Sequence, residues 1–318
     1  MLDVLDIHTH TTASGHAYNT IYEMAQSASR KGLALLGISD HGPAMEGSAS
    51  KHYFRSSRCI PRELYGVKIL FGCELNIMDY DGGVDLDEVF AGALDYGIAS
   101  LHDVCITPGS RAENTRAYLK AMENPKVHII GHPDDGTYAV DFDELVRHAR
   151  ERGVMIELNE ASVRPGSYRK NGRENAAVVL DRCAHYGVKV VVSSDAHVEC
   201  DILRHRYALE LLGTVHFPEE LVVNRSVDAL MAALAYLKKD MDILHREEME
   251  SEVMRVLSRN GMIDMTGSLL PGVDGFDTRM NVGIVSMMRQ CTAYAVRYSH
   301  NSDHWFGPVL AKKFFEQA

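Results

Sequence analysis

The chain has 318 residues, of which 46% are hydrophobic and 24% are charged, and these values exclude collagen-like, disordered and disulfide-scaffold proteins. Its formal net charge of −11 argues against binding nucleic acid or an anionic membrane over the whole surface. One large domain or two modest ones are expected at this length, because single cores stop growing at roughly 250–300 residues.

Short β-rich runs alternate with helical patterns from the N-terminus onward, and this alternation predicts βα units around a parallel sheet. Seven runs are predicted to be strands: Asp3–His10, Leu33–His41, Val67–Asn76, Gly97–Asp103, Lys126–Pro133, Gly153–Glu160 and Gly187–His197. Helical spacing lies between them, in Ile21–Lys31, Asp87–Tyr96, Asn114–Glu123, Phe142–Arg152, Glu174–Tyr186 and Asp201–Leu212. The glycines at positions 32, 97, 153, 187 and 213 are expected to end helices in the left-handed conformation.

The βα rhythm stops near residue 237, and this change predicts two parts of the chain. Residues 1–237 are the predicted α/β part, which ends in an amphipathic helix with Val227, Leu230, Met231 and Leu234 on one face. Residues 238–318 are predicted to be a C-terminal helical extension of unknown role. Alternating strands and helices close as a barrel or stay open as a doubly wound sheet, and the chemistry below favours a barrel.

Cysteine usage and the N-terminus bear on the compartment. The six cysteines form no CxxC pair, so we expect them to be reduced, as in a cytoplasmic protein. The chain does not begin with a basic segment followed by an apolar one, so no secretory signal is predicted. The apolar run Val282–Val296 contains Arg289 and is too short to span a membrane.

Imidazole and carboxylate groups follow six of the seven predicted strands. His8 and His10 lie on the same side of the first strand, because side chains alternate along a strand with period two. The carboxyl ends of parallel strands meet at one face, so residues far apart in sequence are expected to converge there. With His16 from the first loop, the set comprises His8, His10, His16, His41, Glu74, His102, His132, Asp195 and His197.

Nine such groups exceed the needs of one ion, since catalytic zinc takes about three protein ligands. Two or three metal ions are therefore predicted, and Glu74 or Asp195 has two oxygens with which to bridge two of them. The alternative is nine unrelated buried polar residues, each of which would need its own hydrogen-bond partner at a strand end. The histidines on predicted helices, His148, His185 and His205, do not share this placement.

The loop 161–174 carries a local positive patch on an acidic protein. If it folds over the metal face, a guanidinium there can bind phosphate oxygens in bidentate fashion, and Arg169 and Lys170 at mid-loop are the main candidates. The alternative is a solvated basic loop. For the general acid that protonates a leaving group, Asp40, Asp103 and Asp134 are candidates by position alone.

These residues resemble the polymerase and histidinol phosphatase (PHP) family of metallophosphoesterases, and in particular its YcdX-type stand-alone phosphatases. The resemblance extends from residue 1 to about 237. The matching stretches are Asp6-Ile7-His8-Thr9-His10, Ser39-Asp40-His41-Gly42-Pro43, Glu74-Leu75-Asn76-Ile77, Gly131-His132-Pro133 and Ser194-Asp195-Ala196-His197. It implies a distorted (β/α)7 barrel resembling a TIM barrel, with the C-terminal helical segment appended to it.

The resemblance also implies three divalent metal ions, most often Zn²⁺, with Mn²⁺ or Fe as the other choices. His8, His10, Glu74 and Asp195 would hold one ion; Glu74, His102 and His132 a second; His16, His41 and His197 the third. The implied activity is hydrolysis of a small phosphomonoester by a metal-bound hydroxide, since clustered cations lower the pKa of bound water and neutralise phosphate oxygens. Glu74, Asp195 and Arg169 are the predicted catalytic residues.

Three other functions stay open at this point. A phosphodiesterase or nuclease would act on short oligonucleotides or nucleotide bisphosphates; the acidic chain offers no basic stripe for long nucleic acid. An amidohydrolase barrel also begins with HxH but typically has eight strands. A non-catalytic metal-stabilised module would hold ions that have no open coordination position, and its function would lie in the C-terminal segment. The predicted partner is a small phosphorylated substrate, with homo-oligomer formation left open.

Overall fold

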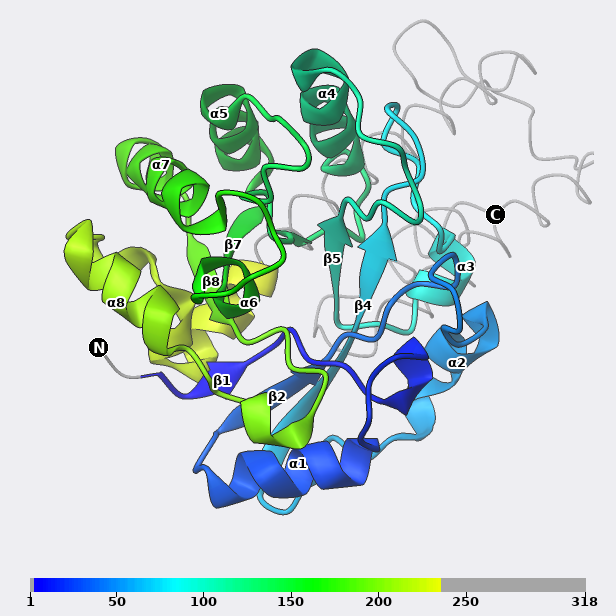
Figure 1. Cartoon of the computed structure of the whole chain (residues 1–318). Helices are drawn as coiled ribbons and strands as arrows, with labels where there is room; N and C mark the ends of the chain where they lie inside the picture. Colours follow the sequence, from blue (N-terminus) through cyan, green and yellow to red (C-terminus); the bar gives the residue numbers. More distant parts are fainter. Residues whose placement is uncertain (1–2, 236–318) are drawn as a thin grey trace, which may run out of the picture. The chain divides into compact units, whose positions relative to one another are not determined.

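The computed structural model describes residues 3–235, in which seven parallel strands form a nearly closed barrel. Neighbouring strands follow the chain order, which places every crossover helix on the outside (Figure 1). The strands are β1 Leu5–Asp6, β2 Leu35–Ile38, β4 Val67–Asn76, β5 Tyr96–Ser100, β6 Ile129–Ile130, β7 Met155–Asn159 and β8 Val190–Ser193. One further short strand, β3 Glu63–Leu64, pairs antiparallel with β4. The predicted α/β barrel is confirmed.

The first and last strands, β1 and β8, are joined by one β-bridge and by side-chain hydrogen bonds, and not by a continuous ladder of backbone hydrogen bonds. Thr9 and Ala196 form one parallel bridge. Below it the buried amide of Asn224 lies between the two edges: its Nδ2 donates to Leu5 O at 3.1 Å and to Val192 O at 2.8 Å. Its Oδ1 accepts from the Val192 N–H at 2.8 Å. One asparagine thus replaces the hydrogen bonds that two paired backbones would make.

Helices surround the barrel, as Figure 1 shows for α1, α4, α5, α7 and α8. The helices are α1 Ile21–Arg30, α2 Lys51–Arg55, α3 Glu88–Ala91, α4 Arg111–Ala121, α5 Phe142–Arg152, α6 Glu160–Val163, α7 Gly172–Tyr186 and α8 Arg206–Thr214. Short 3₁₀ turns cover Thr12–Ser14, Ser56–Cys59, Glu199–Asp201, Glu219–Leu221 and Val223–Arg225. Thr20 and Ser110 begin α1 and α4 with capping boxes, in which the cap hydroxyl and the third-residue glutamate satisfy each other's backbone donors.

Two boundary predictions were wrong. The helix expected over Asp87–Tyr96 is only the short α3, because Tyr96 belongs to β5 and its ring fills the barrel interior. The glycine at position 97 therefore lies in a strand, and Gly213 lies inside α8, so neither ends a helix. Gly32, Gly153 and Gly187 do adopt the predicted left-handed backbone, with φ between 68° and 76°.

The barrel interior is filled from its amino-terminal end upward by apolar side chains. The cluster comprises Leu5, Ile7, Leu35, Leu70, Tyr96, Ile98, Ile129, Met155 and Val191. Its lower end packs against a helix that begins at residue 227 and is described to residue 235. Leu230 and Leu234 of this helix are buried in that cluster, and Val227 and Met231 pack against it. The predicted apolar face is confirmed, whereas residues 238–318 lie outside the described part of the chain.

Tyr96 occupies space that Gly37 and Gly72 leave free, since neither has a side chain. Its hydroxyl donates to Ile7 O at 2.6 Å, and a Cβ placed on Gly72 would lie 2.5 Å from two ring carbons. Within residues 3–235 no helix is long and apolar enough to cross a membrane.

Gly72→Ala is expected to destabilise the protein by about 1–3 kcal/mol, because overpacking a filled interior forces ring and backbone shifts. Urea unfolding followed by circular dichroism measures the change. Gly66→Ala is not a suitable control since its φ is 78°, but Gly213→Ala inside α8 is, because a Cβ there meets nothing within 4 Å. A Gly72→Ala protein as stable as the parent would contradict the packing argument.

Candidate metal centre

The nine predicted ligand residues converge at the carboxyl end of the barrel. His8 and His10 follow β1 at alternate positions and are fully buried. Glu74 lies near the end of β4, and the others follow the ends of β2, β5, β6 and β8 or lie in the loop after β1. The convergence follows from the parallel barrel, which brings all strand ends to the same face.

Glu74 is the centre of the arrangement and is 0% exposed. Its Oε2 lies 2.8 Å from His41 Nδ1, 3.2 Å from His8 Nε2 and 3.5 Å from His10 Nε2. Its Oε1 lies 2.9 Å from His132 Nε2 and 3.3 Å from His102 Nε2. The two oxygens of one carboxylate therefore face two separate groups of imidazoles.

Asp195 lies on the other side of the first group. Its Oδ1 is 3.2 Å from His10 Nε2 and 3.6 Å from His8 Nε2, and its Oδ2 accepts from Arg169 at 2.9 Å. Its φ of 57° is left-handed, as is the 28° of His132. Two non-glycine residues in this region of φ/ψ space are typical of functional sites, where the surrounding contacts hold the strain.

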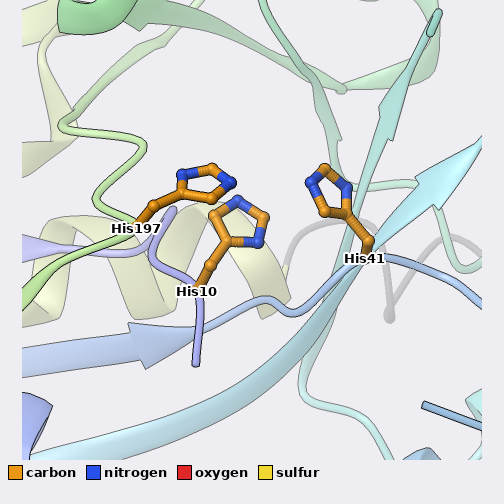
Figure 2. Close-up of side chains that lie close together, drawn as sticks. All are labelled: His10, His41 and His197. Atoms are coloured by element: carbon orange, nitrogen blue, oxygen red, sulfur yellow. The ribbon is translucent and has the colours of Figure 1, made fainter. Parts of the chain in front are cut away.

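A third group of imidazoles combines the buried rings of His10 and His41 with the more exposed rings of His197 and His16. The rings of His10, His41 and His197 point toward one another, as Figure 2 shows, with centroids 4.4 Å apart for His10–His41 and 4.2 Å for His10–His197. His16 joins them: its Nε2 is 3.1 Å from His197 Nε2. Rings packed this closely cannot all be positively charged, because like charges at this separation repel.

Hydrogen bonds on the outer side of the rings assign their tautomers. His8 Nδ1 donates to Glu157 Oε1 at 2.6 Å, and His102 Nδ1 donates to Asn76 Oδ1 at 2.7 Å. His10 Nδ1 donates to Ser14 Oγ at 3.0 Å, because that hydroxyl gives its own proton to Asp40. Outer-shell partners of this kind fix the orientation of metal-ligating histidines.

His132 Nε2 is hydrogen-bonded to Glu74 Oε1 at 2.9 Å, but three other inner nitrogens have no hydrogen-bond partner. His8 Nε2, His10 Nε2, His41 Nδ1 and Glu74 Oε2 are all buried and unsatisfied. In a neutral ring whose Nδ1 carries the proton, Nε2 is a lone pair, so lone pairs face carboxylate oxygens across 3.2–3.3 Å. Such an arrangement is repulsive unless cations lie between the donors, so this donor set fits divalent metal ions.

The charge states of Glu74 and His10 agree with this fit. His8 differs: burial lowers its pKa, but the carboxylates of Glu157, Glu74 and Asp195 outweigh burial and raise the pKa well above its usual value when no cation is present. Burial raises the pKa of Glu74, but the histidines around it outweigh burial and hold the pKa well below its usual value. Burial and the neighbouring rings of His197 and His41 hold the pKa of His10 well below its usual value. Glu74 is therefore ionised and His10 neutral at pH 7, as metal ligands must be.

In the described part of the chain, three groups of residues each offer ligand atoms that lie within 4.8 Å of one another. They are His8, His10 and Glu74; His41, Glu74 and His102; and His10, His41 and His197. The first matches the core of the first predicted ion site. The other two share His41, which the sequence analysis assigned to the third ion alone, so the division of ligands among ions stays a prediction.

Arg169 reaches the metal face, as the folded-over loop requires. It is 7% exposed, and its Nη1 donates to Asn159 Oδ1 at 3.0 Å and to Ser162 Oγ at 3.2 Å. With Nη2 bound to Asp195, the guanidinium is fixed beside the candidate centre while its Nε–H makes no hydrogen bond to a described residue. Arg169 is therefore not a solvated surface side chain, as the alternative interpretation of this loop required.

Glu157 is a site residue that the sequence reasoning missed. It lies in β7, is 3% exposed, and accepts hydrogen bonds from His8 Nδ1, from the His132 N–H at 2.7 Å and from Ser193 Oγ. A carboxylate inside the apolar run Met-Ile-Glu-Leu was the available signal, because a charged residue is rarely buried without a partner. Its strand was the only one to which no site residue was assigned.

The candidates for a general acid differ in environment. Asp40 accepts hydrogen bonds from Thr11, Ser14 and Tyr53, so it supports the loop after β1. Both oxygens of Asp134 are buried without a hydrogen-bond partner, and burial raises the pKa of this carboxyl to about 7.

With this geometry established, the chain can be compared with known proteins. The PHP domain matches residues 6–279. The chain belongs to the PHP domain family. The match continues past residue 237, so the boundary predicted there stays a prediction.

Relatives in the PHP family cover most of the described region. A probable phosphatase of Caldicellulosiruptor saccharolyticus is 43% identical over 238 residues, which are 75% of this chain and 98% of the relative. A probable phosphatase of Caldanaerobacter subterraneus subsp. tengcongensis is 44% identical over 237 residues, 74% of this chain and 92% of the relative. A solved histidinol phosphate phosphatase of Lactococcus lactis, in complex with zinc, L-histidinol and phosphate, superposes with a TM-score of 0.48 at 16% identity, over 69% of this chain and 95% of that one.

Proposed function

We propose that this PHP protein is a metal-dependent phosphatase that hydrolyses a small phosphomonoester at a site for three divalent cations. The observation that carries the proposal is the set of inner imidazole nitrogens that face the oxygens of Glu74 and Asp195 without a hydrogen bond. The probable-phosphatase relatives, one of which aligns over 98% of its length, support the choice of reaction.

The nine residues would hold the ions in overlapping groups. His8, His10, Glu74 and Asp195 are proposed for one position, Glu74, His102 and His132 for a second, and His16, His41 and His197 for the third. Zn²⁺ suits this mixture of imidazoles and carboxylates, and Mn²⁺ and Fe are the other choices. Bound cations of this kind lower the pKa of water and neutralise phosphate oxygens, so no protein nucleophile is required.

The protein side chains supply orientation and additional charge. Arg169 is proposed to direct its unbonded Nε–H toward a phosphate oxygen while its ion pair with Asp195 holds the guanidinium in place. Glu157, Ser14 and Asn76 keep His8, His10 and His102 in the tautomer that presents Nε2 to the centre. This fixed arrangement leaves little reorganisation for the reaction to require.

His10→Ala is expected to lower phosphate release by at least about 10³-fold, because His10 belongs to two of the three close donor sets. The measurement is inorganic phosphate released from a panel of phosphomonoesters and phosphodiesters by protein loaded with Zn²⁺ or Mn²⁺. Elemental analysis should give three ions per chain before the change and fewer after it.

His185→Ala, on the exposed face of α7, is the matched control and should retain both activity and metal content. Fully metallated protein that releases no phosphate from the panel, with His10→Ala indistinguishable from the parent in metal content, would overturn the proposal. Turnover of diesters but not monoesters would replace it with a phosphodiesterase.

A further inference from the structure

Exposed apolar side chains gather at the carboxyl end of the barrel. Eight large hydrophobic side chains are exposed in the described region. Four of them lie in connections that follow β1, β4, β5 and β7 at the carboxyl end of the barrel: Tyr18, Met78, Val104 and, between α6 and α7, Tyr168. Single exposed apolar residues need no explanation, but a set of four around one functional face indicates a ligand with an apolar part.

Tyr18 and Tyr168 are the most exposed of the eight, at 79% and 77%. Neither hydroxyl makes a hydrogen bond to another described residue. The Arg169 guanidinium lies over the Tyr168 ring, and the remaining surface of both rings is open to a flat ligand. These two rings are therefore the main candidates for a contact with the ligand.

Both tyrosines are connected to the segment after β8, Tyr18 through its own backbone and Tyr168 through its neighbour Arg169. The Tyr18 N–H donates to His197 O at 3.0 Å, which fixes the backbone of the loop while its ring stays free. Tyr168 precedes Arg169, whose guanidinium binds Asp195. His197 and Asp195 are themselves 3.7 Å apart through Nδ1 and Oδ1. The two rings thus belong to the rim of the candidate centre, and their anchoring does not depend on the ligand.

Tyr168 is also held beside a cation. Arg169 Cζ lies 5.2 Å from the centroid of its ring, a cation–π distance. The guanidinium that binds Asp195 therefore also holds this ring at the rim, while the ring stays 77% exposed to solvent.

From this placement we propose that Tyr18 and Tyr168 bind a planar aromatic group carried by the alcohol part of the substrate, so that the protein prefers aromatic phosphomonoesters. The inference rests on the proposed phosphatase function. Rings with free faces stack on flat π-systems regardless of the substituents, and each such contact is worth roughly tenfold in binding. An aliphatic alcohol offers no face to stack on.

The preference is tested with substrates that differ in the ring and not in the leaving oxygen. One pair is benzyl phosphate and cyclohexylmethyl phosphate, and the other is adenosine 5′-monophosphate and ribose 5-phosphate. We expect kcat/KM to be at least about tenfold higher for the aromatic member of one or both pairs. Equal values in both pairs, from a protein that does release phosphate, would overturn the inference and leave the proposed function standing; no release from any ester would instead overturn the proposed function.

Variants assign the preference to the two rings. Tyr18→Ala and Tyr168→Ala should each lower kcat/KM for the preferred aromatic ester by about tenfold and change the aliphatic ester by less than about twofold. Tyr168→Phe should keep the preference, since the ring is retained. Tyr65→Ala is the matched control, because Tyr65 is 54% exposed and lies in the β3–β4 turn at the opposite end of the barrel.

The rings have one competing occupant, a second copy of the chain. Light scattering coupled to size exclusion measures this for the parent protein and both alanine variants. An oligomer that dissociates in Tyr18→Ala or Tyr168→Ala, with the aromatic preference unchanged, would overturn the inference.

Discussion

Glu74→Gln is expected to lower kcat/KM for phosphate-ester release by about 10⁴-fold and to remove at least one of the three proposed ions. The substitution keeps the size of the side chain but replaces one anionic oxygen with an amide that repels cations. Both oxygens of Glu74 face imidazole groups within 3.5 Å, so two candidate ion positions are affected at once. The rate falls tenfold for every ~1.4 kcal/mol of charge stabilisation that the transition state loses. A loss of several kcal/mol therefore accounts for the expected effect.

Steady-state phosphate release and elemental analysis on the same preparation measure the two effects. Glu210→Gln is the control, because Glu210 is an exposed partner of Arg173 and lies outside the centre. A thermal melt of the metal-free proteins separates misfolding from loss of ions. If Glu74→Gln kept three ions and parental activity, Glu74 would not be a bridging ligand.

Glu157→Gln is expected to weaken metal binding and activity by about 10- to 100-fold, the usual effect of removing a carboxylate behind a ligating histidine. Glu157 accepts the Nδ1 proton of His8 and the backbone N–H of His132, so it orients two candidate ligands from different strands. A neutral amide lowers the basicity of His8 and offers its Nδ1–H a weaker acceptor.

The decisive readout for Glu157 is metal affinity by chelator competition, which a change in substrate binding does not move. Nitrogen chemical shifts of the His8 ring in the metal-free protein report the tautomer directly. Glu160→Gln, at the first residue of α6, is a matched control. Glu160 accepts hydrogen bonds from backbone N–H groups at the start of α8 and not from the candidate ligands. Unchanged affinity together with an unchanged His8 tautomer would refute the positioning role.

The parallel barrel could be predicted because its local patterns are strong. Val67–Asn76 and Phe142–Arg152 match β4 and α5 residue for residue, since a long apolar run and an amphipathic pattern that ends at Gly153 leave little choice. The prediction that Tyr96 ends a helix was wrong because its position depends on tertiary packing. The ring fills space inside the barrel, and no local sequence pattern reports that. The antiparallel β3 was missed since its two residues carry no periodicity.

The candidate site was predictable to the extent that it depends on strand ends. His8 and His197 are far apart in sequence, and the rule that parallel strands end at one face was enough to bring them together. Glu157 was missed because that rule considers residues at the ends of strands, whereas this carboxylate lies inside β7 and acts from behind the ligands. The partner of Arg169 could not be foreseen, because the course of a long loop depends on packing.

The amide of Asn224 has a consequence for the order of events during folding. It joins residues 219 positions apart along the chain, and contacts of such high sequence separation form late because the loop between them must close first. During synthesis the segment with His8 and His10 emerges long before the segment with Asp195 and His197. These two halves of the candidate centre meet across the edge that Asn224 joins, so cation uptake would report that the newly made chain has completed its fold.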